Sequence, residues 1–176
     1  MKTVRLREQN STRVVENLFE GPLVDLAAFR QPRVEPKVAV VLAADLPADA
    51  LPGDVARAVT GLFLAVDILD ATTEGPESSL IGGSGVVLLG DQLLPLELLG
   101  ELCLYLDGEL VAAESAAELG DPVTRVAWLS SEVEGLQAGD AVLLGSPADS
   151  VPATPGTLLL EGPLGSMLSA NLRCAA

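Results

Sequence analysis

Short apolar runs, each bounded by turn residues, constrain this chain to a fold rich in β-strands. Residues 38–42 form a continuous apolar run between Pro36 and the Asp-Leu-Pro sequence at 45–47, a pattern typical of a buried strand. Comparable runs occur at 85–89, 141–144, 157–161 and 167–172. Between two further runs, 102–106 and 109–113, Asp107-Gly108 supplies the positive φ angles of a tight turn and predicts a β-hairpin.

Two segments change to a helical period. After Pro52-Gly53 the apolar residues recur at spacings of three and four, with Asp54 as the expected N-cap, and this helix is predicted to pass into the apolar stretch 65–69. Its apolar positions are Val55, Ala58, Val59, Leu62, Phe63 and Val66. A second helix is predicted to begin at Pro122, with Asp121 as N-cap, and to end at Gly135. Its predicted apolar face comprises Val123, Val126, Ala127, Ser130 and Val133. Trp128 lies beside that face and is expected to be mostly buried.

Many short strands, two helices and frequent turns indicate an α+β, β-rich class. The length of 176 residues suits one domain of ordinary size. No interior linker divides the chain, so we predict a single domain over residues 1–176. Residues 1–30, with only weak strand signals, form a divergent N-terminal portion of it.

Charge and composition exclude several classes of function. The net charge is −15, and residues 38–176 hold three basic residues against twenty acidic ones. Such a body repels phosphate backbones, so nucleic acid is not an expected partner. The chain has no histidine, which excludes Ser-His-Asp and Cys-His catalysis and His-ligated zinc. Its two cysteines make neither a disulfide framework nor a zinc site.

The first ten residues contain no apolar segment of the kind that signal peptides carry. The longest apolar run is far shorter than a membrane span. We therefore expect a cytoplasmic protein without a membrane partner. The glycines at 82, 83 and 85 precede a strand and do not meet the spacing of a dinucleotide-binding loop, which favours a tight turn there.

A few charged residues stand beside or within the apolar runs. Glu35 and Lys37 are two residues apart, so in an extended strand they share one face. Asp67 and Asp70 flank Ile68-Leu69 in another apolar stretch. Burying a carboxylate is costly unless it is paired, hydrogen-bonded or bound to a metal. These residues are either strand ends that reach solvent or members of one converging polar site.

The sequence QPRVEPKVAVVL at 31–42, followed by DLP at 45–47, resembles the metal-binding strand of the 2-keto-4-pentenoate hydratases and 4-oxalocrotonate decarboxylases, which belong to the fumarylacetoacetate hydrolase superfamily. Three further stretches agree in order and spacing: LAVDIL at 64–69, LGDPVTRVAWL at 119–129 and LQAGDAVLLG at 136–145. The resemblance covers residues 18–172. It implies a mixed β-sheet roll like the fumarylacetoacetate hydrolase C-terminal domain, with two main helices.

The resemblance also implies a site. Family members carry an E-x-E pair on the first strand and a third carboxylate after the first helix, which together hold a divalent ion, usually Mg²⁺. The ion chelates a 2-oxo acid and stabilises an enolate, from which water addition or decarboxylation follows. In this chain Glu35 matches the first metal ligand and Asp67 the third, whereas Lys37 occupies the position of the second.

Other positions depart from the family pattern as well. The substrate-binding loop is occupied by LIGGS at 80–84, with Gly83 and Ser84 at the expected substrate-contacting positions, and Leu144 replaces a Thr or Ser that also belongs to the substrate site. The N-terminal section, which in the family carries a catalytic lysine and a lid, is expected to be largely missing. These changes at one site indicate decayed or redirected chemistry.

Two functions follow as alternatives. In the first, the chain is a divergent, inactive relative that serves as a binding or partner subunit, with an intact hydratase or decarboxylase as its partner and no metal cofactor. In the second, it is a lyase acting on a small 2-oxo acid, in which Glu35 and Asp67 hold Mg²⁺ or Mn²⁺ weakly and Lys37 is the catalytic residue that polarises the substrate carboxylate. A variant of the second has Lys37 forming a Schiff base.

Lys37 is expected within ion-pair range of Glu35 or Asp67, in the role that the metal plays in relatives. We also expect the chain to self-associate as a dimer or a larger oligomer, because its Leu-rich surface leaves few places to bury apolar area.

Overall fold

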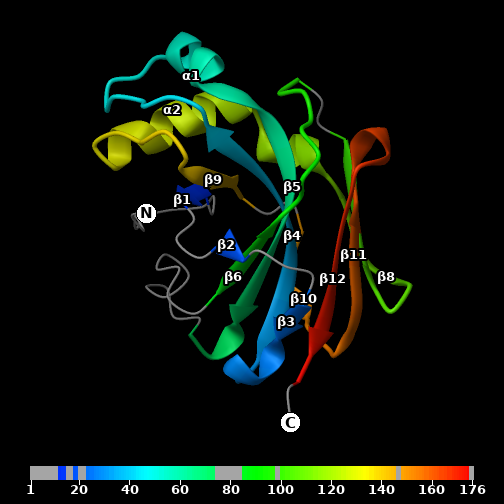
Figure 1. Cartoon of the computed structure of the whole chain (residues 1–176). Coiled ribbons are helices and arrows are strands. Elements are labelled where there is room, and N and C mark those ends of the chain that lie inside the picture. The colour runs from blue at the N-terminus through cyan, green and yellow to red at the C-terminus, as the bar shows by residue number, and fades with distance from the viewer. Residues whose placement is uncertain are drawn as a thin grey trace.

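A computed structural model describes residues 12–14, 18–19, 23–73, 85–97, 100–145 and 148–174. Within these residues two β-sheets and two α-helices form one β-rich structure (Figure 1), and the predicted fold class is confirmed. The larger sheet has the order β1-β9-β4-β5-β6-β2, with β10 also paired to β4. Its strands are β1 Thr12–Val14, β2 Leu18–Phe19, β4 Pro32–Leu42, β5 Val59–Asp70, β6 Val86–Leu89, β9 Ala141–Leu144 and β10 Val151–Pro152.

The second sheet has the order β3-β12-β11-β7-β8 and lies beside the first (Figure 1). Its strands are β3 Leu23–Asp25, β7 Glu101–Leu106, β8 Glu109–Ser115, β11 Gly156–Glu161 and β12 Met167–Arg173. The predicted hairpin is β7 and β8, and its turn residues Asp107 and Gly108 have φ angles of 49° and 80°. The turn prediction is therefore confirmed.

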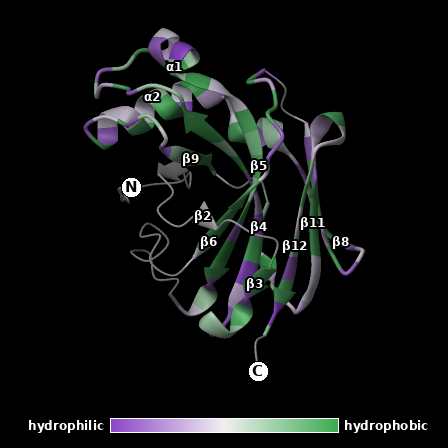
Figure 2. Cartoon of the chain, viewed as in Figure 1, coloured by the Kyte–Doolittle hydropathy of each residue, from purple (hydrophilic) through white to green (hydrophobic). Residues whose placement is uncertain are grey.

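The inward faces of the two sheets form the main core. Val34, Val38 and Val40 of β4 alternate toward it, and Leu158 and Leu160 of β11 meet them from the second sheet. A smaller apolar cluster lies on the other face of the larger sheet and consists of Ala39, Ala65, Val87, Ala141 and Leu143. Figure 2 shows hydrophobic residues concentrated along β5 and the adjoining strands. Both faces of β4 and β5 are thus buried, as the continuous apolar run at 38–42 predicts for β4.

The helices α1 (Pro52–Ala58) and α2 (Pro122–Glu132) lie against each other at one end of the sheets (Figure 1). The predicted N-cap of α2 is confirmed, because the Asp121 carboxylate accepts a hydrogen bond of 2.9 Å from the Thr124 N–H. The predicted apolar face of the helix is largely confirmed: Val126 and Ser130 are buried, Val123, Ala127 and Val133 pack against the main core, and Leu129 is a further buried residue. Trp128 is 38% exposed, so the expectation of a mostly buried indole is wrong.

The first helix is much shorter than predicted. It ends at Ala58, and residues 59–70 form strand β5, which pairs with β4 from Leu42↔Val59 to Pro32↔Asp70. Apolar residues occupy both faces of this strand, so spacings of three and four arise without a helix. Asp54 is not the N-cap. It lies in the first turn, where its carboxylate accepts a hydrogen bond of 2.9 Å from the Leu51 N–H.

Candidate functional site

Strand β4 presents Glu35 and Lys37 on one face of the larger sheet. Alternation along the strand directs Val34 and Val38 into the main core, at 0% and 3% exposure. Glu35 and Lys37 therefore point to the opposite face, where Ala39 belongs to the smaller apolar cluster. The sequence expectation that these two residues share a face agrees with this geometry.

Strand β5 brings Asp67 to the same face. In the antiparallel pairing, Asp67 lies directly opposite Glu35, and Ala65 lies opposite Lys37. The next strand, β6, places Val87 beside Asp67. Asp67 is 4% exposed. The sheet register thus brings together three of the residues predicted for the site, from two strands that are about thirty residues apart in the sequence.

An ion pair joins two of these residues. The Lys37 Nζ lies 2.5 Å from the Glu35 Oε2, and the two side chains are 2% and 18% exposed. Alanines beside Lys37, at positions 39 and 65, leave room for its long aliphatic stem. Burying an ammonium group costs several kcal/mol unless a carboxylate compensates it, so Glu35 is what allows a lysine here. The expected ion pair of Lys37 is confirmed.

The donor set does not fit a divalent cation. Three hard oxygen ligands would suit Mg²⁺ or Mn²⁺, but Lys37 brings a positive charge to this face and its ammonium group engages a Glu35 oxygen directly. No group of three or more metal-ligating side chains occurs within the portion of the chain that the structure describes. A metal at this face would have to displace the ammonium group.

Asp70 binds backbone groups at the start of β4 and has a structural role that Asp67 does not share. Its carboxylate accepts hydrogen bonds from the backbone N–H groups of Arg30 and Gln31, at 2.8 and 3.0 Å, and from the Thr72 N–H and hydroxyl. The pKa of Asp70 lies well below its usual range, and the hydrogen bond from the Arg30 N–H contributes most to lowering it. Asp70 therefore fixes the chain where it enters β4 and does not belong to the Glu35 site.

Of the predicted substrate-binding residues, the structure describes Leu144, which does not lie beside the ion pair. Gly83 and Ser84 lie outside the described residues. Leu144 is fully buried in the main core, on the opposite face of the sheet from Lys37. Its neighbour Leu143 pairs with Ala39 and lies on the site face. Sequence reasoning missed Leu143, although the period of two along β9 would have identified it once the register was known.

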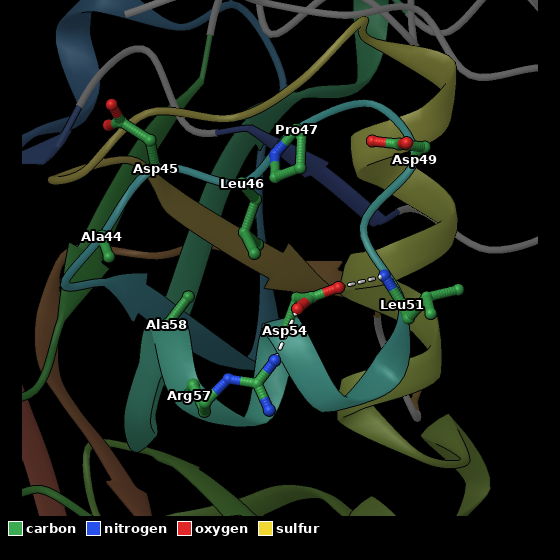
Figure 3. A pocket seen from close by; sticks show the side chains of 9 residues that line it. All are labelled: Ala44, Asp45, Leu46, Pro47, Asp49, Leu51, Asp54, Arg57 and Ala58. Carbon is green, nitrogen blue, oxygen red and sulfur yellow. Dashed lines mark hydrogen bonds and ion pairs between the residues drawn. The ribbon is translucent and has the colours of Figure 1, made fainter.

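A cavity of about 460 Å³ lies elsewhere, between the loop at 44–51 and α1 (Figure 3). It contains none of the predicted site residues. The Asp54 carboxylate in its wall binds the Leu51 N–H and lies 2.6 Å from the Arg57 guanidinium. The Asp45 carboxylate accepts a hydrogen bond from the Ala138 N–H. Both carboxylates therefore form contacts that stabilise the local fold, and we assign no catalytic or binding role to this cavity.

No family model matches the chain. It is 31% identical over 147 residues to a 2-keto-4-pentenoate hydratase of Burkholderia vietnamiensis, covering 72% of this chain and 55% of that protein. It is 29% identical over 151 residues to a 4-oxalocrotonate decarboxylase of a Pseudomonas species, covering 78% and 59%. The chain thus spans between a half and two thirds of the length of these relatives.

Comparison with solved structures identifies similar proteins. The 4-oxalocrotonate decarboxylase from Pseudomonas putida G7, complexed with calcium and acetate, matches with a TM-score of 0.75 and 25% identity, covering 89% of this chain and 65% of that one. A structure of this decarboxylase with magnesium and adipate matches with a TM-score of 0.74 and 23% identity, covering 89% and 66%. A putative fumarylacetoacetate hydrolase family protein from Yersinia pestis shares the fold at a TM-score of 0.65 and 20% identity, covering 86% and 81%.

No helix in the described parts of the chain has the length and apolar character that crossing a membrane requires.

The fold, the order of the matching segments and the named relatives agree with one another. In sequence and fold this chain is related to the 2-keto-4-pentenoate hydratases and 4-oxalocrotonate decarboxylases of the fumarylacetoacetate hydrolase superfamily.

Proposed function

We propose that this chain is a divergent family member that acts as a binding or partner subunit, with an intact hydratase or decarboxylase as its partner. The observation that carries the proposal is the ion pair between Lys37 and Glu35, with its 2.5 Å separation. In this proposal the ammonium group stands where related proteins use a divalent cation. The fold is retained, and the metal-dependent step is not.

The chemistry of the two cations supports this assignment. A divalent ion offers several coordination positions, so it can hold two carboxylates and still bind two oxygens of a 2-oxo acid. An ammonium group has three hydrogen-bond donors and a single charge. With one donor directed to Glu35, Lys37 balances charge but provides little of the polarisation that forms an enolate.

The second candidate is a metal-dependent lyase that acts on a small 2-oxo acid through an enolate. One observation favours it: Glu35 and Asp67 lie directly opposite each other across the strand pair, as two ligands of one ion would. This function requires Lys37 to leave Glu35, or to bind the substrate carboxylate while a metal uses the remaining oxygens.

Turnover assays separate the two candidates. The purified chain is incubated with 2-keto-4-pentenoate and with 4-oxalocrotonate, with and without Mg²⁺ or Mn²⁺, beside an intact hydratase and an intact decarboxylase as positive controls. We expect no metal-dependent loss of either substrate. Turnover that requires added metal and that Asp67→Ala abolishes would overturn the proposal and establish the lyase.

The partner role has its own experiment. The chain and the intact hydratase or decarboxylase of the same organism are co-expressed, with a tag on the enzyme alone, and purified. We expect the two to copurify in a fixed ratio and to sediment as one species. If neither enzyme retains the chain at micromolar concentrations, the partner role is refuted.

A further inference from the structure

The turn of the β7–β8 hairpin, Asp107-Gly108, is the one place in the chain where an aspartate or asparagine precedes a glycine. Such a pair is chemically labile, because glycine has no Cβ to shield its backbone nitrogen. The Gly108 nitrogen can bond to the Asp107 Cγ, and the protonated carboxyl group then loses one water to form a succinimide ring. One water opens the ring, either at Cγ to restore aspartate or at the Asp107 carbonyl carbon to give isoaspartate. The reaction needs no further reactant.

The structure fastens Asp107 to the neighbouring strand β11. Its carboxylate accepts a hydrogen bond of 2.8 Å from the Thr157 N–H, and its own N–H donates to the Thr157 carbonyl oxygen, also at 2.8 Å. The carboxylate lies directly against Gly156, where a Cβ would come 2.5 Å from the Asp107 Cγ. Glycine at position 156 is therefore what leaves room for the carboxylate. Both the backbone and the side chain of Asp107 are held by β11.

These contacts oppose the motion that the reaction requires. Ring closure needs the Asp107 side chain to rotate until its Cγ meets the Gly108 nitrogen. That rotation breaks the hydrogen bond from the Thr157 N–H and removes the carboxylate from Gly156. The reaction therefore proceeds from molecules in which the turn has separated locally from β11, and its rate scales with their fraction.

We propose that Asp107 is a modification site at which isoaspartate forms spontaneously, and that the contact between the turn and β11 controls the rate. The contact suppresses the reaction when closed, and local opening permits it. Both turn residues are exposed, so a repair methyltransferase that recognises isoaspartyl carboxylates can reach the product. This proposal is independent of whether the chain has a hydratase or decarboxylase as its partner.

The product changes the hairpin itself. Isoaspartate adds one methylene group to the backbone of a turn whose two residues need φ angles of 49° and 80°. Strand β8 lies at the edge of the second sheet and pairs there with β7 alone among the described strands (Figure 1). We therefore expect β8 to be the element that the modification releases.

Incubation of the folded chain at neutral pH tests the protection. The reference is the acetylated and amidated peptide YLDGELV, which carries residues 105–111 without β11. An isoaspartyl methyltransferase counts the product by the methyl groups that it transfers, and the loss of Asp-N protease cleavage before residue 107 locates it. We expect the chain to accumulate isoaspartate about tenfold more slowly than the peptide, or more slowly still. Equal rates would overturn the proposal.

Gly156→Ala tests whether the contact with β11 is responsible. Its Cβ would overlap the Asp107 carboxylate and displace it from the Thr157 N–H. Gly165→Ala is the matched control, because Gly165 also has a positive φ, but its Cβ would meet open space. We expect Gly156→Ala to form isoaspartate about fivefold faster than the parent, and Gly165→Ala to match the parent.

Circular dichroism shows whether each variant is folded, and the comparison of the chain with the peptide decides if Gly156→Ala is not. A folded Gly156→Ala that reacts at the parent rate would overturn the proposal. Equal acceleration in Gly165→Ala would overturn it as well, since the rate would then follow general destabilisation and not the contact of Asp107 with β11.

Discussion

Lys37→Glu is the substitution that most directly tests the role of the buried ammonium group. It removes the cation that lies 2.5 Å from Glu35 and places a third carboxylate near Glu35 and Asp67. Breaking a buried ion pair costs about 3–5 kcal/mol, and because Glu35 retains 18% exposure we expect the lower part of that range. For a domain of this size, each kcal/mol lowers Tm by about 2–4 °C. The metal-free variant should therefore melt roughly 10 °C below the parent.

Divalent metal should reverse that loss in the variant only. The substitution restores an E-x-E pair with Asp67 opposite, which is a set of three hard oxygen ligands. A ligand that binds only the folded state stabilises it by about 2.7 kcal/mol at a hundredfold excess over Kd. Thermal unfolding in Mg²⁺ or Mn²⁺ should thus raise the Tm of Lys37→Glu by roughly 5–10 °C, and calorimetry should detect the binding. The parent chain should shift by less than about 1 °C in the same metal, since its site keeps the ammonium group.

Lys37→Met is the matched control, because it removes the same charge without adding a ligand. It should lose stability to a similar extent and recover none of it with metal. The reasoning is refuted if metal stabilises the parent as strongly as Lys37→Glu, since the ammonium group would then not stand in the place of the cation. It is equally refuted if the methionine variant is as stable as the parent.

Three further predictions concern the fold. Gly61→Ala should destabilise the chain by about 2–3 kcal/mol in urea unfolding, because a Cβ there would lie 2.2 Å from the Leu94 carbonyl oxygen; an unchanged midpoint would contradict the close strand contact. Trp128, at 38% exposure, should show iodide-quenchable emission, and a blue-shifted, protected indole would contradict the orientation of α2. Asp70 has a lowered pKa in the folded state, so its stabilising effect is present at neutral pH and is lost as the pH falls below about 3.9, the unfolded value. The Tm difference between the parent and Asp70→Asn should therefore shrink from pH 5 to pH 2, and a difference that grows would refute the assignment.

Local chemistry in the sequence predicted those elements whose boundaries depend on single residues. Asp107-Gly108 specified its hairpin because both turn positions need a positive φ. Asp121-Pro122 specified the start of α2 because side-chain capping and a missing N–H both favour a helix N-terminus. The segment after Ala58 was predicted wrongly, since an apolar strand buried on both faces also satisfies helical spacing. Only its pairing with β4 along the whole length decides between the two.

The candidate site was also predictable only in part. Glu35 and Lys37 share a face because side chains alternate along any strand. The position of Asp67 opposite Glu35 depends on the register between β4 and β5, and only family resemblance pointed to it. Leu144 shows the same dependence on register. It lies in the main core, whereas Leu143, one residue earlier on β9, lies on the site face.

Alternation also explains how the site could change while the fold remained. On β4, the residues that hold the two sheets together and the residues that form the site occupy opposite faces, so a substitution at 37 leaves the contacts of Val38 in the main core intact. The constraint that remains is electrostatic. Glu35 and Asp67 face each other across adjacent strands, at 18% and 4% exposure, and a cation bound to Glu35 lowers their repulsion. A lysine supplies that cation from within the chain and makes the charge balance independent of metal supply. The strand pair can therefore keep both carboxylates whether or not a metal ion is bound, which is why their presence alone does not identify an active lyase.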